Sequence, residues 1–291
     1  MKLPHHDRYA YSDVTTRPVF DWPGGRRLAV YLGLNAEVFA FGEGLGAELA
    51  PGGPQPDVLN YSWRDYGNRV GLPRLREMLD RLGLPCTLLA NSAVYAECPG
   101  LVESFSARGD EIAGHGRSNA ERQGVLPEAE EKALIVEATA VLTEREGTAP
   151  RGWLGPWISQ SAVTPDLLQE AGYQYLLDWC HDDQPIWMTT RGGRILSVPY
   201  PQELNDIPQI VGRKREAREF AAMIRDAFDA MLEESTRRPL VMGIALHGYL
   251  MGQAHRIGPL EEALRYMVER GGDQVWFTTA SAIADAYAEL S

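Results

Sequence analysis

The chain has 291 residues, of which 44% are hydrophobic and 23% charged, and its formal net charge is -12. This length suits one barrel-sized domain or two smaller ones, and the composition is that of an ordinary globular protein. The negative charge argues against a nucleic-acid or anionic-membrane partner, because phosphate contacts require Lys and Arg. No run approaches the roughly 18 apolar residues of a membrane span. The three cysteines have no regular spacing and the first residues lack an apolar signal-peptide stretch, which together predict reduced thiols and a cytoplasmic location.

The pattern of apolar runs and glycine or proline boundaries predicts alternating strands and helices. Residues 1–27 are polar and irregular and form an N-terminal arm, while 28–291 form one domain. Residues 40–62 are rich in Gly and Pro and are expected to form a long loop over a strand end. The predicted strands are 28–34, 86–90, 111–113, 152–153, 175–177, 195–198, 240–246 and 274–278. The predicted helices are 71–82, 99–108, 127–145, 164–172, 215–234, 258–270 and 280–290. Such alternation indicates parallel strands with right-handed crossovers and helices outside, which is an α/β barrel-like domain.

Three of the predicted strands are followed by polar, titratable residues. Glu37 follows the first strand, His115 follows the strand 111–113, and His247 stands at the end of 240–246 beside a glycine. In α/β folds the reacting groups gather beyond the carboxyl ends of parallel strands. Any one of these residues could be incidental, but the three together favour a catalytic site.

Several segments resemble one known superfamily. They are Leu34-Asn35-Ala36-Glu37, Gly114-His115-Gly116, Pro150-Arg151-Gly152-Trp153, 175–185, Val198-Pro199-Tyr200 with Asn205-Asp206, and 246–252. On these motifs, from Trp22 onward, the chain resembles the NodB-type polysaccharide deacetylases of carbohydrate esterase family 4. It is most similar to their branch of metal-independent allantoinases and cyclic imide hydrolases. The resemblance implies a distorted seven-stranded NodB-type barrel.

The departures from the deacetylase pattern concern the metal. The deacetylases carry a catalytic carboxylate followed by a ligand carboxylate, and then two ligand histidines four residues apart. Here Glu37 matches the catalytic carboxylate, but Val38 stands at the ligand position after it. His115 remains, but its partner position is Asn119. Valine cannot coordinate a metal and an amide is a poor zinc ligand, so we expect no metal and no other cofactor.

The resemblance also implies roles for the polar residues. Glu37 is the expected general base, His115 polarises the carbonyl or orients the water, and His247 protonates the leaving nitrogen. A solvated carboxylate and structural histidines are the alternatives. Eight further residues are expected to bind substrate or orient His247: Asn35, Asn119, Arg151, Trp153, Asp182, Asp183, Asn205 and Asp206. Asp182 or Asp183 is the candidate partner of His247, Arg151 could hold an oxyanion or carboxylate or be structural, and Asn205 with Asp206 could recognise ring amides.

Three functions follow as hypotheses. The first is metal-independent hydrolysis of a C–N bond in a small cyclic amide, imide or ureide. The second is a metal-dependent N-deacetylase of an amino sugar, and the third is a non-catalytic binding protein on a deacetylase fold. The loss of ligand residues argues against the second, and the presence of Glu37, His115 and His247 together argues against the third. The sequence does not identify the ring.

The aromatic N-terminal arm predicts an assembly. Residues 1–22 contain His6, Tyr9, Tyr11, Phe20 and Trp22 without regular structure of their own. Such an arm gains stability where its aromatic rings are buried, so we expect a homo-oligomer, a dimer or tetramer, with the arm at an interface or over the pocket mouth. The alternative is an arm that wraps its own barrel.

Overall fold

The structure is a computed structural model, which describes residues 3–290. Within these residues one curled sheet has nine strands, in the order β6-β7-β5-β4-β3-β2-β1-β8, with β9 added on β1. The strands are β1 (Leu28–Ala36), β2 (Thr87–Ala90), β3 (Glu111–Gly114), β4 (Gly152–Trp153), β5 (Tyr175–Leu176), β6 (Ile186–Thr190), β7 (Gly193–Ser197), β8 (Leu240–His247) and β9 (Val275–Thr278).

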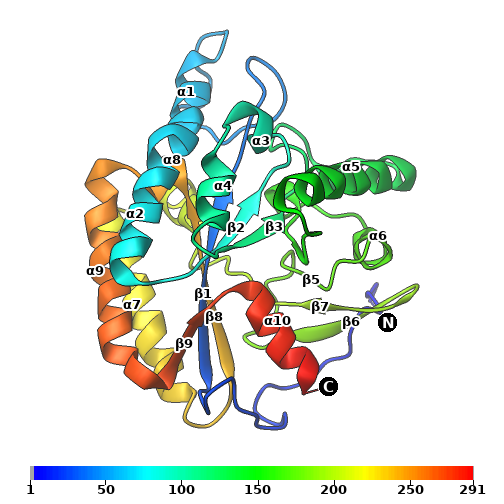
Figure 1. Cartoon of the computed structure of the whole chain (residues 1–291), viewed down its shortest axis with the longest axis vertical. Coiled ribbons are helices and arrows are strands. Elements are labelled where there is room, and N and C mark those ends of the chain that lie inside the picture. The colour runs from blue at the N-terminus through cyan, green and yellow to red at the C-terminus, as the bar shows by residue number, and fades with distance from the viewer. Residues whose placement is uncertain (1–2, 291) are drawn as a thin grey trace.

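Helices cover the outside of this sheet. They are α1 (Val58–Tyr66), α2 (Leu72–Leu82), α3 (Val94–Glu97), α4 (Leu101–Ser106), α5 (Glu128–Glu146), α6 (Thr164–Glu170), α7 (Ala217–Glu234), α8 (Gly248–Met251), α9 (Ala254–Gly271) and α10 (Ala280–Glu289). Figure 1 shows β1 and β8 side by side at the centre, with α2, α7 and α9 on one flank and α5 and α6 on the other. No helix among residues 3–290 has the length and apolar character needed to cross a bilayer.

The predicted fold class, an α/β barrel-like domain of the NodB type, is confirmed, and two parts of the sheet were not foreseen. All described strand pairs are parallel except β6 with β7, which form an antiparallel hairpin. The resemblance implied seven strands and the sequence pattern eight, whereas the structure has nine among the described residues; the strand that was not predicted is β6. The sheet curls until the segment after β7 meets β8, where the Ala245 amide donates to the Leu204 carbonyl at 2.9 Å.

The loop predicted over 40–62 is shorter than expected. It ends at Asp57, whose carboxylate caps α1 by accepting a hydrogen bond from the Asn60 amide at 3.1 Å. A π-helical segment, η1 (Gly67–Gly71), follows α1 directly and joins it to α2. A second π-helical segment, η4 (Ile207–Gly212), follows Asp206. Neither π-helix has a periodicity that sequence reasoning could have separated from an α-helix or a loop.

The N-terminal arm lies against its own barrel in this chain. Arg8 pairs with Asp166 at 2.6 Å, and Arg17 pairs with Asp182 at 2.6 Å. Trp22 is buried in the barrel core and its ring nitrogen donates to the Leu240 carbonyl at 3.1 Å. This is the alternative that the sequence left open, whereas the predicted assembly stays a prediction.

Candidate active site

Strand parity directs the three predicted catalytic residues to one place. Side chains alternate between the two faces of a strand. On β1 the side chain of Tyr31 points to the inside of the barrel. Glu37 lies six residues later, an even number, so its side chain points inward as well. On β8 the inner face includes Ala245 and therefore His247. His115 follows β3 with the same parity, and these three side chains meet above the carboxyl ends of the strands.

The Glu37 carboxylate is the centre of this cluster. Its Oε1 atom accepts from the Asn119 amide nitrogen at 2.6 Å and lies 3.4 Å from Nε2 of His115. The same oxygen lies 3.5 Å from Nε2 of His247. Its Oε2 atom accepts from the Tyr249 hydroxyl at 3.1 Å. All five side chains are buried.

The charges of Glu37 and His247 stabilise each other. Burial raises the pKa of Glu37, but the charge of His247 and the hydrogen bonds from the imidazoles outweigh burial and lower that pKa well below its ordinary value. Burial lowers the pKa of His247, but the charges of Asp206 and Glu37 dominate and raise it to about 10. At neutral pH the site therefore holds an ionised carboxylate beside a protonated imidazole.

Asp206 fixes the orientation of His247. One of its carboxylate oxygens accepts from Nδ1 of His247 at 2.6 Å, and the other accepts from the His247 backbone amide at 2.8 Å. Burial raises the pKa of Asp206 even though His247 opposes this. Because Nδ1 is engaged with Asp206, Nε2 of His247 is the nitrogen that points toward Glu37 and carries a transferable proton.

His115 presents its other nitrogen to the same point. Its Nδ1 lies 2.7 Å from the Leu154 carbonyl oxygen, which can only accept, so Nδ1 carries the hydrogen. The other ring nitrogen, Nε2, faces Oε1 of Glu37 at 3.4 Å. The pair can therefore contact one water molecule that sits beside both atoms on the cavity side.

Asn119 directs its N–H group, not its oxygen, toward the site. A series of hydrogen bonds that begins at the Val38 backbone amide shows this orientation. The Val38 N–H donates to Oδ1 of Asn91 at 2.9 Å, and this fixes which Asn91 atom is the oxygen. The Asn91 nitrogen donates to Oδ1 of Asn119 at 2.9 Å, so the Asn119 nitrogen must be the atom that faces Glu37. The Asn119 oxygen is turned away from Glu37.

This donor set does not fit the divalent metal that the deacetylase fold implies. A metal would need oxygen or imidazole ligands, but Asn119 offers an N–H and Val38 offers no donor atom. Within residues 3–290, no three His, Cys, Asp or Glu side chains are grouped so as to hold a metal ion. The Asn119 amide and the protonated His247 supply the positive potential around Glu37 instead.

A cavity of about 210 Å³ opens beside these groups. Trp157 and Ile158 form part of its wall, with φ angles of 63° and 51°, in the left-handed region that non-glycine residues rarely adopt. Its lining consists of Asn35, Glu37, His115, Asn119, Leu154, Trp157, Ile158, Tyr200, Gln202, Asn205, Ile207, Pro208, His247 and Tyr249.

Of the eight predicted substrate-binding or orienting residues, Asn35, Asn119 and Asn205 line this cavity, and Asp206 lies directly behind His247. The expected partner of His247 was Asp182 or Asp183, and this is corrected by the structure. Asp182 pairs with Arg17 of the arm. The Asp183 carbonyl accepts from the Val241 amide, near the start of β8 and far from His247 at its end.

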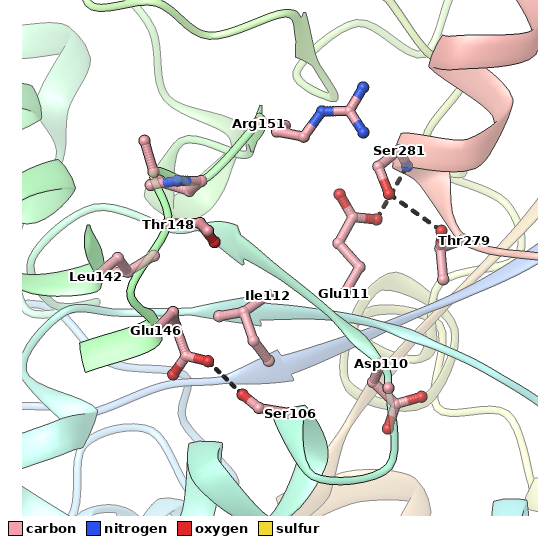
Figure 2. Close-up of a pocket in the computed structure, with 13 residues that line it drawn as sticks. Ser106, Asp110, Glu111, Ile112, Leu142, Glu146, Thr148, Arg151, Thr279 and Ser281 are labelled. Atoms are coloured by element: carbon pink, nitrogen blue, oxygen red, sulfur yellow. Dashed lines mark hydrogen bonds between the residues drawn. The ribbon is translucent and has the colours of Figure 1, made fainter. Parts of the chain in front are cut away.

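Arg151 and Trp153 also lie outside the cavity. Arg151 precedes β4, so it sits at the amino ends of the strands, where it pairs with Asp285. Figure 2 shows Arg151 at a separate cavity of about 300 Å³, beside Glu111 and Ser281. The Trp153 side chain points to the outside of the barrel, beneath α5 and α6. Its ring centroid lies 5.3 Å from that of Tyr173.

Sequence reasoning missed four side chains that shape the site: Tyr249, Asn91, Asn68 and Tyr200. Tyr249 was two positions after His247 and had the same strand-end signal. Asn91 follows β2 as Glu37 follows β1, so the rule that pointed to Glu37 could have found it. Tyr200 follows β7 within the quoted motif Val198-Pro199-Tyr200 and so also stood near a strand end, whereas Asn68 reaches the site from a π-helix and carries no such signal.

The comparisons with known proteins agree with this fold. The family model for polysaccharide deacetylase matches residues 58–176. A solved structure of a probable polysaccharide deacetylase from Pseudomonas aeruginosa PAO1 is 29% identical, with a TM-score of 0.83, over 96% of this chain and 98% of that one. A solved Puue allantoinase is 27% identical, with a TM-score of 0.82, over 97% and 98%.

A curated peptidoglycan deacetylase from Helicobacter pylori is 26% identical over 149 residues, which is 48% of this chain and 48% of that protein. The match thus spans about half the length of this relative. The barrel and its strand-end cluster define a NodB-type β/α domain. Over residues 58–176 the chain is similar to polysaccharide deacetylases, and its structural neighbours include a probable polysaccharide deacetylase and an allantoinase.

Proposed function

We propose that this protein hydrolyses a C–N bond in a small cyclic amide, imide or ureide without a metal. The observation that carries the proposal is the pairing of an ionised Glu37 with a protonated His247, 3.5 Å apart, in a donor set unsuited to a metal. A carboxylate base and an imidazolium acid are the two groups that amide hydrolysis requires.

The reaction begins with a water molecule held by Glu37 and His115. Its oxygen attacks the ring carbonyl carbon while Glu37 accepts its proton, because the water becomes more acidic as the C–O bond forms. The charge that develops on the carbonyl oxygen is stabilised by the protonated His247 and by amide N–H groups of the cavity. Nε2 of His247 then donates its proton to the ring nitrogen, the C–N bond breaks, and the ring opens to an acid and an amine, amide or urea N–H, according to the ring. Loss of a proton from Glu37 and uptake of one by His247 restore the starting state.

The cavity supports a small substrate. Its volume of about 210 Å³ lies below the roughly 300–1,000 Å³ of sites for drug-sized ligands. Trp157 and Tyr200 offer aromatic surface for a ring, and the amides of Asn35 and Asn205 can pair with polar groups of the ring. The allantoinase neighbour supports this substrate class. The deacetylase names of other relatives support the alternative, a metal-dependent amino-sugar deacetylase.

A hydrolysis screen separates the two functions. The purified protein is incubated with hydantoin, succinimide, a dihydropyrimidine, allantoin and an N-acetylated chito-oligosaccharide, each with and without a strong chelator. Ring opening and acetate release are measured by chromatography. We expect ring opening that survives the chelator, and metal analysis that finds much less than one equivalent of Zn²⁺. Acetate release that disappears with the metal would establish the deacetylase instead.

We also propose a homo-oligomer, on the aromatic arm of residues 1–22. Light scattering of the full chain and of a variant lacking the residues before Trp22 measures its mass. A full-length monomer would rule this assembly out.

A further inference from the structure

Two short helical segments touch through their backbones beside His247. They are η1 and α8, and four glycines lie where they meet: Gly67, Gly71, Gly248 and Gly252, here called the glycine clasp. A methyl group on Gly67 would lie 2.7 Å from the Tyr249 backbone nitrogen, and one on Gly248 would lie 2.6 Å from the Gly67 carbonyl oxygen. On Gly71 and Gly252 it would collide with backbone atoms of the facing segment. Only glycine permits this approach.

Each segment of the clasp sends one side chain to Glu37. From η1, the Asn68 side chain donates to the Glu37 backbone carbonyl at 2.7 Å. From α8, the Tyr249 hydroxyl donates to Oε2 of Glu37 at 3.1 Å. Both side chains are buried. Glu37 is therefore hydrogen-bonded at its backbone carbonyl by Asn68 and at its carboxylate by Tyr249. The glycine clasp fixes the positions of these two residues relative to each other.

The Tyr249 ring has little freedom to move. It packs edge-on against Trp63 at 4.8 Å and Phe39 at 6.2 Å, and it lies 5.6 Å from the His247 ring. Its hydroxyl reaches the carboxylate oxygen that the imidazoles do not approach, since both imidazoles and Asn119 face Oε1. The two oxygens of Glu37 thus have separate surroundings.

We infer that Tyr249 is a positioning residue that turns Oε1 of Glu37 toward the substrate and favours the ionised carboxylate. The glycine clasp then connects the segment that positions the base, Glu37 after β1, to the segment that follows the acid, His247 at the end of β8. This inference rests on the proposed function, in which Glu37 is the base. A hydrogen bond to the charged form of a carboxylate lowers its pKa. Loss of the hydroxyl should therefore leave a base that is less well oriented and more easily protonated.

The test is Tyr249→Phe, which removes one oxygen atom and keeps the ring packing. Tyr95→Phe is the matched control, because the Tyr95 hydroxyl is also bonded at 2.6 Å to a carboxylate, that of Glu146, outside the catalytic cavity. For Tyr249→Phe we expect kcat to fall by about tenfold or more with KM nearly unchanged. The acidic limb of the kcat/KM pH profile should move to higher pH. Tyr95→Phe should leave both as in the wild type.

A second measurement does not depend on any substrate. Titration of the Glu37 carboxylate by ¹³C NMR should give a higher pKa in Tyr249→Phe than in the wild type and no change in Tyr95→Phe. An unchanged Glu37 titration, or an unchanged kcat and pH profile in an active enzyme, would overturn the inference. If the wild type opens no ring but the titration moves as expected, the proposed function fails and the positioning role of Tyr249 stands.

Discussion

Glu37 and Glu111 are buried or partly buried carboxylates at opposite ends of one sheet, and their surroundings differ in kind. Glu37, beyond the carboxyl end of β1, faces two imidazoles and an amide. Glu111, at the amino end of β3, accepts from the hydroxyls of Tyr175 and Thr87. It also accepts from the Ser281 backbone amide, as Figure 2 shows. Both carboxylates accept several hydrogen bonds, but only Glu37 contacts a charged donor, because the Arg151 guanidinium near Glu111 forms its ion pair with Asp285.

The pKa values follow from this difference. Burial dominates at Glu111 and raises its pKa, because hydrogen bonds from neutral donors only partly compensate. At Glu37 the positive charge of His247 and the imidazole hydrogen bonds overcome burial and lower the pKa. Neutral hydrogen-bond donors, like those around Glu111 at the start of α10, suit a structural carboxylate. A positively charged donor, like His247 beside Glu37, keeps a carboxylate ionised and suits a base. The comparison teaches that the partner's charge, rather than burial or the number of hydrogen bonds, decides which acid can act in chemistry.

The sharpest test of this comparison is Glu37→Gln. The variant keeps size and most hydrogen-bonding capacity but removes the basic oxygen, so kcat should fall by roughly 10² to 10⁴. Because the new amide N–H meets a neighbouring donor and His247 loses a charged partner, the free energy of unfolding should fall by about 1–3 kcal/mol. Steady-state kinetics and calorimetry measure the two effects. A variant that retains more than half of the activity would show that Glu37 is not the base.

The second test, with a smaller effect, is Asp206→Asn. The variant removes the charge that raises the pKa of His247, so the acid should lose its proton at lower pH. We expect kcat/KM to fall by about tenfold to a hundredfold at pH 8, with the basic limb of the profile moved to lower pH.

The same pKa also predicts how stability depends on pH. The pKa of His247 is raised in the folded state from 6.5 to about 10. Its contribution to stability is therefore complete below pH 6.5 and is lost as the pH rises toward 10. Chemical denaturation across this range should show a shallower decline in Asp206→Asn than in the wild type. Parallel curves would contradict the assignment.

The third test, Glu111→Gln, should hardly affect catalysis. The new amide group places its N–H donors against a neighbouring donor, so the free energy of unfolding should fall by about 1–3 kcal/mol. Because the folded pKa of Glu111 is raised, its stabilising contribution is present at acidic pH and declines as the pH rises through that value. Urea titrations at several pH values should therefore show the largest difference from the wild type under acidic conditions. A loss of kcat comparable to that of Glu37→Gln would contradict the conclusion that Glu111 is structural and Glu37 catalytic.

Much of the fold was predictable because its strands are buried runs with clear boundaries. The run from Leu28 and the run from Leu240 fixed two central strands, and strand-end logic then brought Glu37 and His247 together. The same logic explains the error at Arg151. Arg151 comes before the two-residue strand β4 rather than after it, so it lies at the opposite end of the sheet.

The supports of the site were harder to predict, because they depend on contacts between distant segments. Asp206 orients His247 from across the closure of the sheet, and neither residue carries a local signal of the other. Asp182 was the more prominent acid in the sequence, but the N-terminal arm engages it through Arg17. The glycine clasp likewise pairs segments that only the completed barrel brings into contact.

The pairing of β1 has a consequence for how the protein is made. Leu28 near the start of the chain pairs with both Leu240 and Val275 near its end. Contacts between such distant residues form late, because a long chain must be ordered before they can be made. During synthesis β1 emerges early and must wait for β8, so an apolar strand stays without one of its partners while most of the chain is translated. The pairing of β1 with β8 also brings His247 to Glu37, so we expect the pairing that covers β1 and the assembly of the reacting groups to occur together, late in folding.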